Sequence, residues 1–140
     1  MTVRVPCAGA LVHDGAGRLL LVRRGTEPGR GLWSVPGGRC EPGETAAETA
    51  VREAREETGL VVTAGPVVGR VERPGPGGVT YVIDDVACRP AGGTLAVGDD
   101  ADDVRWVDAA GFAALPLVDG LAEALAGWDV LPRWSHFPHR

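Results

Sequence analysis

The sequence predicts a single α/β domain over residues 1–140, a sandwich in which helices cover a mixed β-sheet. A chain of 140 residues is typical of one domain with its own core. Hydrophobic residues make up 44% of it and charged residues 24%, as in ordinary globular proteins. Several short segments are rich in β-branched residues, one long amphipathic helix lies among them, and shorter helical segments follow.

Turn signals divide the chain into elements. Asp14–Gly17 separates the first two strand-like segments, and the proline- and glycine-rich stretch 73–78 is a turn that no regular element can cross. In chain order we expect a hairpin over 3–24, a loop over 25–31, a short strand over 32–38, a helix over about 45–58, an extended segment over 60–72, a turn over 73–78, a strand over 79–90, a turn over 91–93 that leads into 94–97, a strand over 104–107, helices over 108–115 and 118–128, and a tail over 129–140 without clear periodicity.

The central helix carries its own start and stop signals. Thr45 and Glu48 form a capping box, and Gly59 suits the left-handed position after the last helical residue. A small apolar face is predicted to pack on the sheet, and it consists of Ala47, Val51, Ala54 and Thr58.

The opposite face of this helix concentrates negative charge. Glu53, Glu56 and Glu57 lie there, with Arg52 at the edge. A solvated helix face is the simpler interpretation. Against it, the acids occupy the C-terminal half of the helix, where the macrodipole disfavours them, and no lysine four residues on relieves their repulsion. Hard oxygen ligands at this spacing suit Mg²⁺ or Mn²⁺.

Residues 38–60 resemble the Nudix hydrolase signature, a pattern of fixed glycines, acids and one arginine. The matching positions are Gly38, Glu44, Arg52, Glu53, Glu56, Glu57, Gly59 and Leu60. Ala54 fills the internal apolar position of the pattern. It is small for that position, and this departure affects packing more than chemistry. The resemblance implies a Nudix-type sandwich, and a divalent cation that neutralises a diphosphate and activates a water molecule.

Roles for individual residues follow from the same resemblance. It implies that Glu56 and Glu57 bind the metal, that Glu53 is a further ligand or the general base, and that the Gly38 region adds a backbone carbonyl. Arg52 would orient a neighbouring glutamate. Support of the loop is assigned to Glu44, Gly37 and Gly59.

The loop after the sheet offers a further acid. Asp99, Asp100, Asp102 and Asp103 precede a short strand, and a solvated turn is the simpler interpretation. Nudix members often supply one more acid from this region, and our candidates are Asp100 and Asp103. We expect Asp100 to act in catalysis, because it lies further into the loop.

Candidate substrate contacts surround the glycine-rich loop. Arg23, Arg24 and Arg30 are candidates for phosphate, although each reads equally well as a surface arginine. Trp33 and Tyr81 are candidates for stacking on a base, but core packing is the better interpretation of both. Core or interface positions are also expected for Trp106, Phe112 and Trp128, and no metal-ligand spacing is found at His13, His136 or His139.

Charge and composition limit the partners. A net charge of −5 provides no basic surface for long nucleic acid. No apolar run reaches the ~18 residues that span a membrane, and no signal peptide is recognisable, so we expect a cytoplasmic protein. Cys7 and Cys88 are expected to be buried, and Cys40 lies in a loop.

The substrate is expected to be a small nucleotide. A nucleoside diphosphate derivative such as ADP-ribose or a sugar nucleotide comes first, because 78–90 and 98–107 resemble the same regions of small ADP-ribose pyrophosphatases. The alternatives are a pyrophosphohydrolase that removes oxidised or surplus (d)NTPs and a nucleotide sensor without catalysis. A homodimer is left open.

Overall fold

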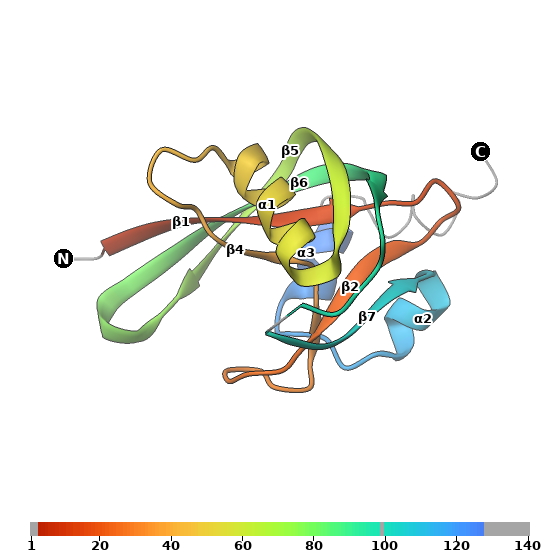
Figure 1. Ribbon diagram of the computed structural model, residues 1–140. Coiled ribbons are helices and arrows are strands. Elements are labelled where there is room, and N and C mark those ends of the chain that lie inside the picture. Colours follow the sequence, from red (N-terminus) through yellow and green to blue (C-terminus); the bar gives the residue numbers. More distant parts are fainter. Residues whose placement is uncertain (1–2, 99, 128–140) are drawn as a thin grey trace.

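The computed structural model describes residues 3–98 and 100–127, whose arrangement is shown in Figure 1. The elements are β1 (Val3–Val12), β2 (Leu19–Arg24), β3 (Trp33–Ser34), β4 (Gly37–Arg39), α1 (Ala46–Thr58), β5 (Leu60–Pro74), the 3-10 turn η1 (Pro76–Gly78), β6 (Val79–Gly93), β7 (Ala101–Val107), α2 (Ala109–Ala114) and α3 (Leu121–Gly127). Within the described residues, no helix has the length and apolar character needed to cross a bilayer.

The strands form two sheets. The larger has the order β4-β1-β6-β5, and the smaller has the order β3-β2-β7. β1 runs parallel to β6, with Val3 opposite Val79 and Val12 opposite Cys88. Its other neighbour, β4, is antiparallel, so the larger sheet is mixed as predicted.

Side chains alternate along β1 and β2, so that both strands contribute to two hydrophobic cores. Val12 and Leu20 belong to the core that packs against Ala54 of α1. Leu11 and Leu21 belong to the other core, which α2 and α3 cover. Helices therefore lie on both sides of the strands, which confirms the predicted α/β/α sandwich.

The prediction of a hairpin over residues 3–24 is wrong. The turn is present, and Asp14 Oδ1 accepts hydrogen bonds from the backbone N–H groups of Ala16 (2.7 Å) and Arg18 (3.1 Å). Beyond the single bridge between His13 and Leu19, however, β1 and β2 enter different sheets. The connection between the two strands is long enough for the chain to cross from one sheet to the other, and each strand finds its partners elsewhere.

Helix α1 confirms its predicted ends but lies rotated from the predicted face. Its fully buried stripe consists of Thr49, Ala50, Ala54 and Thr58, whereas Ala47 and Val51 are only half-buried. Both stripes lie on the same side of the helix. The shift arises because α1 packs against β1 and β5 at once, and periodicity alone does not fix that angle.

Three smaller differences concern element boundaries. The short strand predicted over 32–38 divides at Pro36 into β3 and β4, and the turn predicted over 91–93 belongs to β6. Segment 94–97 has no regular structure. The predictions for Asp99, Trp128, His136, His139 and the tail 129–140 lie outside the described residues.

Candidate active site

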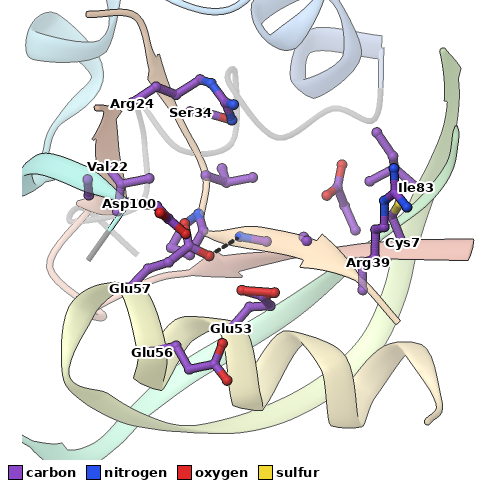
Figure 2. A pocket seen from close by; sticks show the side chains of 18 of the residues that line it. Cys7, Val22, Arg24, Ser34, Arg39, Glu53, Glu56, Glu57, Ile83 and Asp100 are labelled. Carbon is purple, nitrogen blue, oxygen red and sulfur yellow. Dashed lines mark hydrogen bonds between the residues drawn. The ribbon is translucent and has the colours of Figure 1, made fainter. Parts of the chain in front are cut away.

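A cleft of about 780 Å³ opens between the two sheets at the end of α1. Its walls come from β1, β2, the β3–β4 segment, α1, β6 and the start of β7. In Figure 2, Glu57 and Asp100 lie toward one side of this cleft, and Cys7, Arg39 and Ile83 lie toward the opposite side.

The ends of α1 fix where its acidic side chains point. Thr45 Oγ1 accepts from the Glu48 backbone N–H at 3.1 Å, and Glu48 Oε1 accepts from the Thr45 N–H at 2.9 Å. At the other end Gly59 has a φ of 77° and donates its N–H to the Arg55 carbonyl at 3.0 Å. The reciprocal cap and the left-handed glycine hold the helix in register between the glycine-rich loop and β5.

Glu53 and Glu57 meet the backbone of β4. The Gly37 N–H donates a hydrogen bond to Glu57 Oε2 at 3.0 Å. A Cβ atom on Gly38 would overlap with the carboxylate of Glu53, so only glycine permits this approach. Gly37 and Gly38, the two glycines predicted in the loop, therefore allow two carboxylates of α1 to lie against the backbone of β4.

Burial and mutual repulsion shift both carboxyl groups. The pKa of Glu57 is raised to about 8, mainly by burial and also by the charge of Glu53, while the hydrogen bond from Gly37 opposes the shift. Burial also raises the pKa of Glu53, against the stabilising charge of Arg52. Two neighbouring, half-buried acids that resist ionisation are stabilised when a cation compensates their charge.

The carboxylates of the cleft suit a hard divalent cation, because they offer oxygen donors. Glu53 and Glu57 are the paired donors, and Glu56 instead approaches Arg52 Nη1 at 3.2 Å. Among the described residues, no three His, Cys, Asp or Glu side chains already converge closely enough to hold a metal ion.

Arg52 joins the glycine-rich loop to the acidic face. Its Nε donates to Glu44 Oε2 at 2.7 Å and its Nη2 to Glu44 Oε1 at 3.0 Å, a bidentate pair. Glu44 also accepts from the Thr49 hydroxyl at 2.7 Å and from the Glu41 N–H at 2.9 Å. The hydrogen bonds from Arg52 are the main cause of the low pKa of Glu44, about 2. Glu44 therefore braces the loop as an ionised carboxylate.

The arginines of β2 occupy one wall of the cleft. Arg23 and Arg24 both line it, and Arg24 Nε donates to the Pro28 carbonyl at 2.7 Å. Arg23 Nε lies 3.7 Å from Asp102 Oδ2. Asp100 lines the same cleft and is exposed.

Three candidate residues lie elsewhere. Arg30 is exposed on the loop before β3, 4.0 Å from Glu27, and does not line the cleft. Trp33 is 3% exposed in the core beneath α2 and α3, so its ring has no free face for a base. Asp103 Oδ2 accepts from Arg105 Nε at 3.0 Å, outside the cleft lining.

Tyr81 differs from its predicted core position. It lies half-buried in the cleft wall, where its hydroxyl accepts from Arg39 Nη2 at 3.0 Å and the Arg39 guanidinium lies 5.3 Å from its ring centroid. The predictions of buried positions for Cys7, Cys88 and Phe112 are confirmed, and Trp106 packs partly buried against the α1 core.

Sequence reasoning missed Asp85. This residue lines the cleft, is only 5% exposed, and has its pKa raised to about 6, mainly by burial. The sequence did contain a signal for it, the two consecutive aspartates Asp84 and Asp85 in the middle of a predicted strand. Successive side chains of a strand point to opposite faces of the sheet, so one of the two must point inward.

Comparisons with known proteins agree with this geometry. A family model described as NUDIX domain matches residues 3–127. An ADP-ribose pyrophosphatase from Methanocaldococcus jannaschii is 35% identical over 97 residues, which cover 65% of this chain and 54% of that protein. A putative 8-oxo-dGTP diphosphatase from Bacillus subtilis is 43% identical over 67 residues, or 48% of this chain and 43% of that protein. The chain thus spans about half the length of these curated relatives.

A solved structure extends the comparison to the fold. The crystal structure of a MutT NUDIX hydrolase from Burkholderia pseudomallei superimposes with a TM-score of 0.78 at 23% identity. The superposition covers 88% of this chain and 96% of that one. At this identity the likeness establishes the fold.

Proposed function

The chain belongs to the NUDIX domain family, and from this premise we propose that it is a divalent-metal-dependent hydrolase. It cleaves the diphosphate linkage of a nucleoside diphosphate derivative, such as ADP-ribose or a sugar nucleotide. The observation that carries the proposal is the pair Glu53 and Glu57, two half-buried carboxylates held against Gly37 and Gly38 at the wall of an open cleft. The relative from Methanocaldococcus jannaschii supports this substrate class.

The residues of the cleft take different roles. Glu53, Glu57 and the backbone carbonyl of Gly38 would hold Mg²⁺ or Mn²⁺, and Glu56, which lies beside Arg52, would be a further ligand. Such an ion, when bound, would neutralise the diphosphate and make water easier to deprotonate. Arg23 and Arg24 bind phosphate oxygens from the β2 wall.

Proton removal falls to an acid of the cleft. Glu53 and Asp100 are the candidates for accepting the proton of the attacking water. Arg52, fixed by Glu44, orients Glu53 and Glu56 through its Nη1 atom, which lies 3.4 Å from Glu53 and 3.2 Å from Glu56.

A second candidate function is hydrolysis of (d)NTPs. The relative from Bacillus subtilis, a putative 8-oxo-dGTP diphosphatase, favours it. Both functions use the same carboxylates and differ in the group beyond the diphosphate.

A hydrolysis screen tests the proposal. Purified protein is incubated with Mg²⁺ and ADP-ribose, sugar nucleotides, dinucleoside polyphosphates or (d)NTPs, and the products are separated by chromatography. We expect turnover that stops in excess EDTA and rises toward alkaline pH. The Glu53→Gln/Glu57→Gln double variant controls for contaminating phosphatases. Binding without hydrolysis of any compound would favour a sensor, and full turnover in EDTA would exclude the metal.

A further inference from the structure

Asp85 lies on the floor of the cleft without a partner for one of its oxygens. Tyr81, Ile83 and Asp85 alternate along β6 and all line the cleft. Asp85 is only 5% exposed, and within the described part of the chain its Oδ1 atom is buried and accepts no hydrogen bond. An unpaired buried acceptor costs free energy. Because Asp85 also lines the cleft, its carboxyl group points to a donor that arrives with the ligand.

The neighbouring strand leaves room for this carboxyl group. Gly9 on β1 pairs with Asp85, and a Cβ atom at Gly9 would overlap with Asp85 Oδ1. On the other side Gly9 pairs with Gly37, whose N–H binds Glu57. Gly37, Gly9 and Asp85 therefore form a row across three adjacent strands, and two strand spacings separate its ends by about 10 Å.

This row places Asp85 away from the phosphate end of the cleft. The charged groups that act on its pKa are Asp84 and Arg73, of β6 and β5. With a pKa of about 6, Asp85 is ionised at neutral pH and only accepts hydrogen bonds. A carboxylate without a cation repels phosphate, so the diphosphate belongs beside the arginines of β2 and the glutamates that would hold the metal ion. The other end of the nucleotide belongs beside Asp85.

We propose that Asp85 is a specificity-determining residue that accepts a hydrogen bond from the N–H edge of a purine base and selects guanine or hypoxanthine over adenine. This inference rests on the proposed function, because it concerns the base of the nucleotide that the same cleft takes. It favours guanine nucleotides over ADP-ribose as the substrate class.

The choice of base follows from the pattern of donors. Guanine presents N1–H beside its exocyclic amino group, and hypoxanthine retains N1–H. Adenine presents one amino group flanked by ring nitrogens whose lone pairs repel a carboxylate. A site built to bind an N–H group discriminates strongly against an analogue that lacks it, because the buried acceptor then stays unpaired.

Equilibrium binding tests the inference without depending on hydrolysis. Calorimetry in Mg²⁺ compares GMP, IMP, AMP and N1-methyl-GMP on the wild-type protein and on Asp85→Asn. Asp84→Asn is the matched control, because Asp84 is the adjacent residue of the same strand and accepts from Arg70 Nε at 2.7 Å. Thermal unfolding checks that each variant is folded.

We expect the wild type to bind GMP and IMP at least about ten-fold more tightly than AMP or N1-methyl-GMP. In Asp85→Asn the preference for GMP is lost and the affinity for AMP stays or rises, because an amide matches the donor and acceptor of adenine. The control retains the wild-type ratio.

Three results would overturn the inference. They are equal binding of GMP and AMP by the wild type, no effect of N1-methylation, and an equal loss for all nucleotides in Asp85→Asn, which would indicate contact with ribose. The methylated ligand needs no variant, so the test stands even if Asp85→Asn does not fold. Selective GMP binding without hydrolysis of any nucleotide would overturn the proposed function and leave the role of Asp85 intact.

Discussion

The backbone N–H of Gly37 donates to Glu57 Oε2 at 3.0 Å, and this hydrogen bond ties the glycine-rich turn to the acidic face of α1. It orients a carboxylate that is half-buried and close to Glu53. The turn thus holds the position of an acid that the metal-free cleft disfavours in its charged form.

Replacing Glu57 by Gln should separate activity from stability. We expect kcat to fall about 10²- to 10⁴-fold, because the amide keeps the shape but loses the charge that attracts the cation. Thermal stability in EDTA should stay the same or rise slightly, because a buried repulsion has gone. Initial rates and thermal denaturation measure the two effects, with Glu123→Gln on α3 as the control. Activity within a few-fold of wild type would show that Glu57 does not bind the metal.

Arg52→Lys tests the network that positions the acids. Lysine retains the charge but cannot make the bidentate contact with Glu44 and reach Glu56 at the same time. We expect kcat or Mg²⁺ affinity to fall about 10- to 100-fold and the melting temperature to drop. Titration of activity with Mg²⁺ distinguishes the two. An unchanged kcat, Mg²⁺ affinity and melting temperature would show that Arg52 does not position the acids.

Asp100→Asn and Asp103→Asn form a matched pair on one loop and strand. Asp100 lines the cleft, whereas Asp103 pairs with Arg105 outside it. We expect Asp100→Asn to lower kcat by about 10²-fold with little change in Mg²⁺ dependence, and Asp103→Asn to have a smaller effect. Steady-state kinetics over a range of Mg²⁺ concentrations make the comparison. Equal, negligible effects of both substitutions would support the simpler interpretation, in which these aspartates form a solvated turn without a catalytic role.

Asp85 should make the stability of the protein depend on pH. Its pKa is about 6 in the folded protein against an ordinary value of 3.8, so the folded state holds the proton more tightly than the unfolded chain. The protonated carboxyl group of Asp85 therefore contributes to the free energy of unfolding below pH 4. This contribution, about 1–3 kcal/mol, is lost as the pH rises to about 6. Denaturant titrations at pH 4 and pH 7 should show this loss in the wild type and a smaller one in Asp85→Asn. The same loss in both proteins would assign it to other groups.

Local signals predicted the helix and its acids well. The capping box, Gly59 and the spacing of Glu53, Glu56 and Glu57 depend on neighbours within a few residues, and the structure has the same helix ends. Its face was less predictable, because Thr49 and Ala50 are buried by strands distant in sequence.

Contacts between distant segments were not visible in the sequence. Core packing was the better interpretation of Trp33, but the sequence did not show that α2 and α3 are the elements that bury it. Asp85 becomes a cleft residue only because β6 lies beside β1, where Gly9 leaves space for its carboxyl group. The separation of the predicted hairpin into two sheets has the same origin.

The parallel pairing of β1 with β6 also governs when the cleft can form. Position 3 pairs with position 79, so β1 has its parallel neighbour only after the 75 residues between these two positions have been synthesised. Pairing over such sequence distances is slow, because the intervening loop must first be ordered. A nascent chain that ends before Val79 therefore has the acidic helix but no cleft floor, and it carries an open edge on β1 that a chaperone or a second chain can occupy.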